Sequence, residues 1–290
     1  MRSASLAGAR RSIPFVCWSV PLPDRAASPD SVCATLAAIR ARAPLVHNIT
    51  NFVVTNSTAN ALLAIGASPA MVEGAEEVED FAARADALVI NLGTMSAPRA
   101  AVIRLAVAAA RKASRPWIMD PVAVGAIPTR AALARELLAH GPAVVRGNGS
   151  EIAALTGAAG GRGVDSTAGA GDAAAAALRL AREAGVVAAV TGAIDRVTDG
   201  TRMVWIGNGD PMMTRVTGLG CTATALIGAC LAVERDPLAA AAHGLAILGV
   251  AGEIAVARAR GPGSLQVEIL DALHRLDAAT VLGMARMGHG

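Results

Sequence analysis

The chain has 290 residues, of which 53% are hydrophobic and 17% charged, so it can bury a sizeable core and global disorder is not expected. A formal net charge of only +3, with three Phe, three Trp and no Tyr, argues against nucleic-acid binding, which uses basic surfaces and aromatic stacking. Four cysteines without a CxxC pair or zinc-type spacing argue against a disulfide scaffold or a zinc site, and they favour a reducing, cytoplasmic location.

The N-terminal 30 residues contain arginines and a short apolar run, 13–20, that is interrupted by Pro14. This composition favours a flexible extension over a signal peptide. From residue 31 to residue 290 there is neither a repeat nor a linker rich in Pro, Gly or Ser. We therefore expect one domain over 31–290.

From residue 30 onward, helical and strand-like segments alternate. Residues 30–43 predict a helix with Asp30 as its N-cap, 44–50 a strand that runs into a loop, and 56–66 a helix ended by Gly66. Strands are predicted next at 69–72, 87–93, 117–120, 143–148 and 186–192, with helices at 75–85, 98–113 and 129–140 between them. This alternation implies βαβ crossovers, hence an α/β fold whose mostly parallel sheet carries helices on both faces.

The pattern changes near Met203. Segments 202–207 and 211–218, separated by "NGD", predict a hairpin that adds antiparallel strands at one edge of the sheet. After Cys221 the sequence is nearly all helical. The apolar stretch 238–252 is too short to span a bilayer and predicts a buried helix, so no membrane association is expected.

Ligands of open parallel sheets bind beyond the carboxyl ends of the strands, which selects polar residues that directly follow a predicted strand. The candidates are His47, Asn48, Asn51, Met71, Asn91, Gly93, Thr94, Asp120, Arg146, Asn148, Glu151, Thr191, Gly192 and the turn 217–221. They contain no Ser/His/Asp order and no HExxH, and neither GxGxxG nor GxxxxGK[ST] occurs as a strand-to-helix loop. Hydride transfer and Walker-type ATP hydrolysis are therefore poorly supported.

Two glycine turns precede alanine-rich helical sequence: "TAGAGDAAAA" at 167–176 and "TGLGCTATAL" at 217–226. The second would open a helix whose N-terminal N–H groups suit an anion such as a transferring phosphoryl group, although an ordinary tight turn is an equal alternative from spacing alone. The first follows a glycine-rich loop rather than a strand, and its Asp172 is better interpreted as a helix N-cap. Of the two, we expect the turn with Cys221 to be the active site.

Several segments resemble the hydroxyethylthiazole kinases of the ribokinase-like superfamily, which act in thiamine biosynthesis and salvage. They are "PLVHNITNFVVTNSTANALLAIGASPAMV", "LVINLGT", "WIMDPVAVGA", "VVRGNGSEIAALTG", "VTGAID", "VTGLGCTATALIGACLAVE" and "GPGSLQVEILDAL". "HNITN" together with "GASPAM" is specific to the thiazole kinases, whereas the NxxE of Asn148–Glu151 and the glycine turn are shared by the superfamily. Leu219 departs from the pattern, since a smaller residue is usual there, and Phe52 stands where a polar residue is often found.

The resemblance implies ATP-dependent phosphorylation of the hydroxyethyl group of 4-methyl-5-(2-hydroxyethyl)thiazole by a homotrimer with active sites between subunits. It implies catalysis by Cys221, substrate binding by Met71, Gly218 and Asn48, ATP binding by Arg146 and Thr191, and Mg²⁺ held by Glu151 and Asp120 directly or through water. A helix N-terminus would lower the thiol pKa and nearby phosphates would oppose that shift, so Cys221 is expected to be a modest base or only a hydrogen-bond partner of the substrate.

Other functions stay open at this point. One is a kinase for a sugar or another small vitamin-type alcohol, with Asp172 as base. Another is an ATP-dependent dehydratase on the same fold, and a third is a nucleotide-binding protein without turnover. The same residues also have structural interpretations: Met71 as core, Arg146 in a surface ion pair, Asp120 capping a turn, and Glu151 stabilising the start of its own helix.

Overall fold

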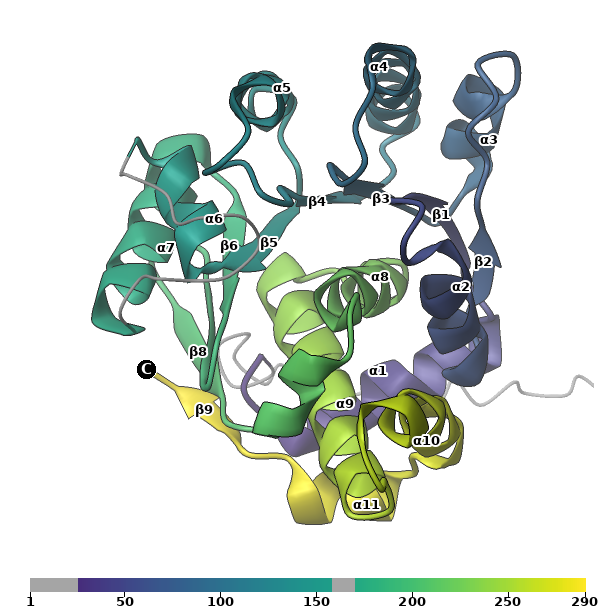
Figure 1. Ribbon diagram of the computed structural model, residues 1–290, viewed down its shortest axis with the longest axis vertical. Coiled ribbons are helices and arrows are strands. Elements are labelled where there is room, and N and C mark those ends of the chain that lie inside the picture. Colours follow the sequence, from purple (N-terminus) through teal and green to yellow (C-terminus); the bar gives the residue numbers. More distant parts are fainter. Residues whose placement is uncertain (1–25, 158–169) are drawn as a thin grey trace, which may run out of the picture.

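In the computed structural model, which describes residues 26–157 and 170–290, the strands form one mixed sheet in the order β2-β1-β3-β4-β5-β6-β7-β8-β9 (Figure 1). The strands are β1 (Leu45–Ile49), β2 (Ser68–Ala70), β3 (Ala87–Asn91), β4 (Trp117–Asp120), β5 (Val144–Asn148), β6 (Val187–Thr191), β7 (Asp195–Thr198), β8 (Met203–Ile206) and β9 (Met287–His289). Neighbours from β2 to β6 are parallel, and the pairs from β6 to β9 are antiparallel. The predicted α/β fold with an antiparallel edge is confirmed.

Helices cover both faces of the sheet (Figure 1). One face carries α3 (Val78–Arg84), α4 (Ala97–Lys112), α5 (Pro128–Leu138), α6 (Gly149–Leu155) and α7 (Ala170–Ala184). The other carries α1 (Pro29–Arg42), α2 (Thr55–Ala64), the 3₁₀ helix η2 (Pro211–Arg215), α8 (Leu219–Leu231), α9 (Pro237–Val256), α10 (Pro262–Arg275) and α11 (Ala278–Met284). Successive strand residues point to opposite faces, so Val89 joins one hydrophobic core and Ile90 the other.

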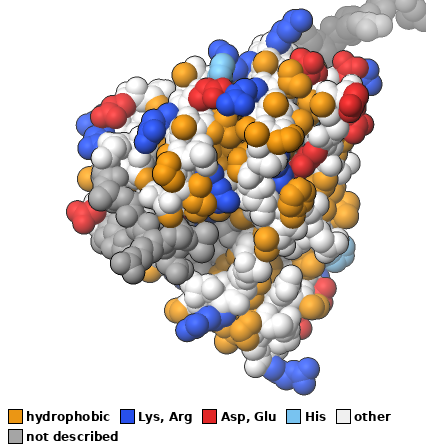
Figure 2. Space-filling model, turned by 45° about the horizontal axis from the view of Figure 1, so that its top comes forward, with side chains coloured by type: hydrophobic (Ala, Val, Ile, Leu, Met, Phe, Trp, Pro, Cys, Tyr) orange, Lys and Arg blue, Asp and Glu red, His pale blue; other side chains and the backbone are white. Residues whose placement is uncertain are grey.

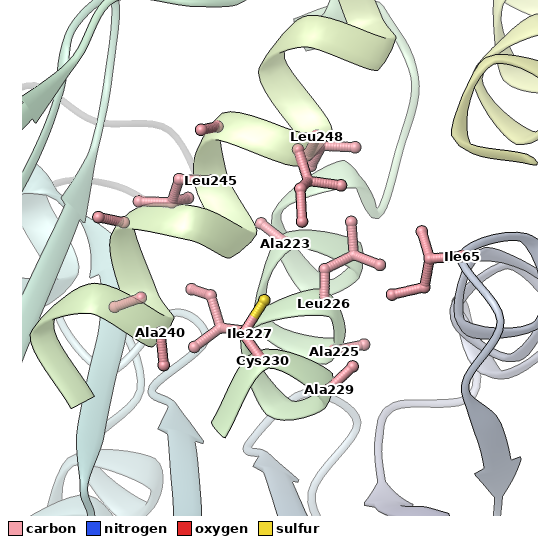
Figure 3. Close-up of a cluster of buried hydrophobic side chains, with 14 of the residues drawn as sticks. Ile65, Ala223, Ala225, Leu226, Ile227, Ala229, Cys230, Ala240, Leu245 and Leu248 are labelled. Carbon is pink, nitrogen blue, oxygen red and sulfur yellow. The ribbon is translucent and has the colours of Figure 1, made fainter. Parts of the chain in front are cut away.

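The core beneath α8 and α9 fixes where α8 begins. Every residue of α8 from Thr222 to Leu231 is buried. A Cβ on Gly244 of α9 would lie 2.9 Å from the backbone nitrogen of Ile227, so the two helices approach closely because this residue has no side chain. Leu245 and Leu248 of α9 extend this contact across α8 (Figure 3). The first turn of α8 is therefore held in place by the packing of the rest of this helix.

The antiparallel edge differs from the predicted hairpin. The partner of β8 is β7, with Thr198 opposite Met203, and the predicted second strand instead forms η2 after the Asp210 side chain caps the backbone nitrogen of Met212 at 2.7 Å. The turn between β7 and β8 contains Asp199 and Gly200, which has a φ of +92°. Asp-Gly is itself a hairpin signal, and in the structure this pair, rather than "NGD", connects the two strands. Strand β9, at the C-terminal end, was not predicted.

Two helix predictions also need correction. Helix α1 begins at Pro29 after Ser28, so Asp30 lies in the first turn and is not the N-cap; proline favours this first position. The predicted apolar stretch is part of the 20-residue α9, which is long and apolar enough to cross a membrane by length and composition. Its burial is as predicted, because 83% of its apolar window lies inside the protein.

The start of the chain was predicted to be a flexible extension over residues 1–30. Residues 1–25 of it lie outside the described residues, so this stays a prediction. Ala26 is fully buried and α1 begins at Pro29, so the packed structure starts before residue 31.

Candidate active site

Two cavities lie at the edge of the sheet where the parallel strands end. The last residues of β3, β4, β5 and β6 are Asn91, Asp120, Asn148 and Thr191, and the parallel pairing brings all four ends to this edge. The first cavity, of about 440 Å³, is lined by Asn51, Val53, Val54, Gly93, Thr94, Asp120, Val122, Arg130, Arg146, Asn148, Glu151, Thr217, Gly218, Gly220 and Cys221. The start of α8 therefore forms part of its wall.

The second cavity, of about 620 Å³, adjoins the first and is partly apolar. Its wall includes Thr191 and Asp195 from the β6–β7 region, Met213 from η2, and Leu245 and Leu248 from α9. The two cavities share four lining residues, which are Arg146, Thr217, Gly218 and Gly220. The glycine turn thus stands at the junction between two adjoining binding spaces.

Close contacts surround both glycines of this turn, and the restriction is strongest at Gly218. Gly218 has a φ of +84°, and a Cβ on it would lie 2.3 Å from Cγ1 of Val54. A Cβ on Gly220 would lie 2.6 Å from Nη1 of Arg146. The first N–H groups of a helix have no intrahelical acceptor and carry partial positive charge, so the start of α8 is suited to an anion.

Cys221 stands in the first turn of α8 and lines the first cavity. Its Sγ accepts hydrogen bonds from Nδ2 of Asn91 at 3.2 Å and from Nδ2 of Asn51 at 3.4 Å. Burial, reinforced by the negative charge of Asp120, raises the pKa of the Cys221 thiol to about 12. The expected lowering of this pKa at the helix N-terminus is therefore wrong, because desolvation outweighs the dipole.

Arg146 lies between the two cavities. Its Nη2 donates to Oγ1 of Thr191 at 2.6 Å, and its Nη1 is 3.8 Å from Oδ2 of Asp120. The residue is only 9% exposed, so the ion pair is screened little by water. The interpretation of Arg146 as a surface ion pair is therefore wrong: it is a buried cation that faces both cavities.

Two carboxylates form the floor of the first cavity. Asp120 is 1% exposed; its Oδ2 accepts from Oγ1 of Thr224 at 2.8 Å, and its Oδ1 is buried without a hydrogen-bond partner. Glu151 accepts from the backbone nitrogens of Ala123 and Asn148, both at 2.9 Å, and with Asn148 it forms a capping box. Burial raises the pKa of both carboxyls, and the proximity of Asp120 raises that of Glu151 further.

Two carboxylates are too few for a metal site made of protein side chains alone. They are enough for Mg²⁺ when water and substrate phosphates complete its coordination. Within residues 26–157 and 170–290 no group of three or more His, Cys, Asp or Glu side chains could hold a metal ion. Magnesium in phosphoryl-transfer sites is commonly held by one or two carboxylates, with water and substrate phosphates completing the shell. The unpartnered Oδ1 of Asp120 is the acceptor that such an ion, or its water, would use.

Two predicted substrate residues do not reach either cavity within one chain. Asn48 is fully buried in β1, and its Nδ2 donates to the carbonyl of Val46 at 2.9 Å. Met71 follows β2, is half-buried and lines neither cavity. Their neighbour His47 is also buried, with Nε2 2.8 Å from the carbonyl oxygen of Val72. The substrate roles of Asn48 and Met71 stay predictions.

Several lining residues were missed by the rule that site residues follow strands. Arg130 stands in the first turn of α5, where its Nη1 donates to the carbonyl of Val122 at 3.1 Å. Met213 and Leu248 reach the second cavity from η2 and α9. The predicted hairpin had placed Met213 in a strand, and Leu248 was predicted only as part of a buried helix. No local sequence signal identifies these residues, because only the packing of distant segments brings them to the cavity.

The described part of the other glycine turn contributes no residue to either cavity. Asp172 is exposed in the first turn of α7 and lines neither cavity. It stands inside the helix rather than at the predicted N-cap position. Residues 167–169 of that turn lie outside the described residues.

Residues 36–279 match the model of the hydroxyethylthiazole kinase family. The chain belongs to the hydroxyethylthiazole kinase family. A hydroxyethylthiazole kinase of Granulibacter bethesdensis is 66% identical over 252 residues, which cover 87% of this chain and 92% of that relative. One from Tolumonas auensis is 50% identical over 259 residues, covering 88% and 97%.

Solved structures agree with this family. The hydroxyethylthiazole kinase protein of Pyrococcus horikoshii superposes with a TM-score of 0.85 at 40% identity, covering 90% of this chain and 99% of that one. Pyridoxal kinase of Staphylococcus aureus, solved with pyridoxal, superposes with a TM-score of 0.54 at 17% identity, covering 71% and 86%. The second likeness shows only that the family shares its fold with another group of kinases.

Proposed function

We propose that this protein transfers the γ-phosphoryl group of ATP to the hydroxyethyl group of 4-methyl-5-(2-hydroxyethyl)thiazole, a step of thiamine synthesis and salvage. The observation that carries the proposal is the position of the Gly218–Cys221 turn, at the junction of two cavities in a chain of this family. One cavity suits the alcohol and the other the nucleotide. An anion-binding helix start between them is what a direct transfer between two bound substrates needs.

The second cavity is the proposed ATP site. Its apolar wall, with Leu245 and Leu248, suits an adenine ring, and Thr191 and Arg146 lie toward the junction with the first cavity. A guanidinium has the planar donor geometry that phosphate oxygens accept, so Arg146 would bind the phosphates. Phosphoryl transfer passes through a loose transition state, for which positioning and charge stabilisation supply most of the catalysis.

Asp120 and Glu151 would hold Mg²⁺, directly or through water. The ion would neutralise charge on the phosphates of ATP as they approach the start of α8. Burial disfavours the charged form of both carboxyls, and a cation between them would reverse that effect. Nη1 of Arg146 lies 3.8 Å from Oδ2 of Asp120, and Oδ1 of the same carboxylate has no hydrogen-bond partner.

Cys221 would position the substrate hydroxyl rather than act as a strong base. Two amide N–H groups already donate to its sulfur, which leaves the S–H to donate toward the oxygen of the substrate. The raised pKa of this thiol agrees with a protonated group at neutral pH. In a loose transition state the hydroxyl proton need not leave early, so a weak base or none is sufficient.

The alcohol site is proposed to be completed by a second copy of the chain, in a homotrimer with active sites between subunits. Val53, which lines the first cavity, is 65% exposed, its neighbour Phe52 is 72% exposed, and Leu63 of α2 is also exposed. On the face drawn in Figure 2, hydrophobic side chains lie interspersed with charges of both signs. Sedimentation should give a trimer; a monomer at micromolar concentration would contradict this arrangement.

Met71 lines no cavity within one chain, so it could contact the alcohol only at a site between subunits. Its substitution therefore tests the same arrangement kinetically. Met71→Ala should raise the KM for the thiazole alcohol more than it lowers kcat, since it removes apolar contact made equally in ground and transition states. The lost transfer energy should be on the order of 1–3 kcal/mol. A pure kcat defect with unchanged KM would argue against a role in substrate binding.

The substrate assignment is tested by a panel of alcohols. The kcat/KM for ADP release should be highest with the hydroxyethylthiazole and lower with a pyridoxine-type alcohol or a sugar. A higher kcat/KM for either of these would assign the chain to another alcohol kinase. ADP release with dehydration of the substrate and no phosphorylated alcohol would identify a dehydratase.

The three free cysteines in the described residues, Cys33, Cys221 and Cys230, support the proposed cytoplasmic location.

A further inference from the structure

The end of β3 and the loop after β1 bring two asparagine side chains to the sulfur of Cys221. Asn91 is the last residue of β3 and Asn51 follows β1. They are 1% and 5% exposed, and they donate to the sulfur at 3.2 and 3.4 Å. Nδ2 of Asn51 also donates to Oδ1 of Asn91 at 3.0 Å. The three side chains thus form one hydrogen-bonded group that links three separate segments.

The orientation of both amides is fixed by the backbone. Oδ1 of Asn91 accepts from the nitrogen of Gly93 at 2.9 Å, and Oδ1 of Asn51 accepts from the nitrogen of Val53 at 3.1 Å. Turning either amide over would place an NH₂ group against a backbone N–H, where no hydrogen bond can form. Each NH₂ group is therefore held toward the sulfur.

Gly93 leaves the space that this arrangement needs. A Cβ on Gly93 would lie 2.7 Å from Cβ and 2.9 Å from Nδ2 of Asn51. The same residue donates the backbone N–H that fixes Asn91. Its lack of a side chain thus has a specific consequence here, which is the close approach of Asn51 to Asn91 and Cys221.

We propose that Asn51 and Asn91 form an amide clamp that holds the Cys221 sulfur at the start of α8, and that Asn91 is a positioning residue whose main effect on phosphoryl transfer is exerted through Cys221. Asn51 lines the first cavity, whereas Asn91 does not and reaches the reacting atoms only by way of its neighbours. The effect of the clamp on turnover rests on the proposed kinase function. The clamp itself is a property of the free protein.

The clamp also defines what position 221 can carry. Two convergent N–H donors require an acceptor there, which sulfur supplies and which a carboxylate oxygen would supply more strongly. An alanine at 221 would remove the shared acceptor, so Nδ2 of Asn51 would keep only its bond to Oδ1 of Asn91, and Nδ2 of Asn91 would lose its bond to sulfur. The clamp therefore predicts that an aspartate could replace Cys221 as the acceptor of both N–H groups.

A double-mutant cycle separates positioning from general stability. The four proteins are the wild type, Asn91→Ala, Cys221→Ala and the double variant, with kcat measured at saturating ATP and thiazole alcohol. Asn91→Ala should lower kcat about three- to tenfold, the worth of one hydrogen bond, while the KM for the alcohol stays within about twofold. In the Cys221→Ala background the same change should have less than about a twofold effect.

Equal losses in both backgrounds would overturn the proposal, because they would mean that Asn91 acts without Cys221. Asn60→Ala is the matched control: it removes an exposed amide of α2 that bonds Asn56 at 2.9 Å, and it should leave kcat unchanged. If Asn91→Ala does not fold, Asn91→Asp keeps the shape and removes the donors, and the same cycle with Asp is expected to be non-additive. Additivity in that cycle would equally contradict the clamp.

A second measurement needs no turnover. Iodoacetamide alkylation of Cys221 in the substrate-free protein is followed by peptide mass spectrometry at one alkaline pH, with Cys33 in the same sample as reference. Donated N–H bonds favour the reactive thiolate, so Asn91→Ala should slow alkylation of Cys221 about three- to tenfold and leave Cys33 unchanged. An unchanged Cys221 rate would overturn the clamp, whereas absent thiazole phosphorylation with a slowed rate would overturn only the proposed substrate.

Discussion

The two glycine turns have nearly the same local sequence and very different surroundings. The turn before Cys221 starts a helix that is buried along its length between α9 and the sheet, and its N-terminus opens onto two cavities. Asp172 lies in the first turn of α7, a helix with one buried side and one exposed side, and it is exposed itself. A glycine turn therefore becomes a candidate active site when it lies beside the carboxyl ends of the parallel strands. The apparent reactivity of its side chain is a poorer guide.

Substitution of Cys221 is expected to have the largest effect on activity, because its turn is the proposed site of transfer. Cys221→Ala should lower kcat about 10²–10⁴-fold, the range for loss of a group acting on the transferring proton or its oxygen. Cys221→Asp should stay active, because a carboxylate also accepts from Asn51 and Asn91. Both variants should still bind ATP. A Cys221→Asp protein that folds and binds ATP but is inactive would contradict the assigned role of the thiol.

Arg146 tests the junction between the cavities. Arg146→Ala should raise the KM for ATP more than that for the alcohol, by a factor that reflects about 1.5–3 kcal/mol for a hydrogen bond to a charged group. Arg104→Ala is the matched control, since Arg104 forms an exposed pair with Glu136 at 2.6 Å and lines neither cavity. If both substrates lost affinity equally in Arg146→Ala, a folding defect rather than ATP binding would explain the variant.

The pH dependence of kcat sharpens the role of the thiol. With a pKa of about 12, Cys221 stays protonated as pH rises past the ordinary thiol value near 8.5, and at pH 9 only about one molecule in a thousand is a thiolate. The ratio of wild-type kcat to that of Cys221→Ala should therefore be nearly constant from pH 8 to pH 10. A tenfold rise of this ratio per pH unit would show that the thiolate is the active form.

The smallest effect is expected at the other turn. Asp172→Asn should leave kcat and both KM values within about twofold, because the side chain is exposed and lines neither cavity. A few tenths of a kcal/mol of stability can be lost, since a negative charge in the first turn of a helix is favourable. A hundredfold fall in kcat would reverse the comparison and assign catalysis to the first turn.

The sequence predicts the parallel part of the fold well, because each strand there is a short apolar run between helices. It predicts the edge poorly. Both "NGD" and the Asp199–Gly200 pair are hairpin signals, and only the packing of η2 against α9 and α10 decides between them.

The site divides in the same way. Asp120, Arg146 and Cys221 could be found because they follow strands or open a helix. Met213 and Leu248 could not, because distant segments bring them to the second cavity. The direction of the thiol pKa shift was also beyond the sequence, since it depends on how deeply Cys221 is buried.

Transfer of the γ-phosphoryl group of ATP to the thiazole alcohol at the Cys221 turn requires that one phosphorylated thiazole forms for each ADP. The most direct measurement is the product balance of the purified wild-type protein with Mg²⁺, ATP and 4-methyl-5-(2-hydroxyethyl)thiazole, with ADP and the phosphorylated thiazole both quantified over time. We expect equal amounts of the two products, and strongly reduced but still equal amounts with Cys221→Ala. ADP without phosphorylated thiazole, or full activity in Cys221→Ala, would contradict it.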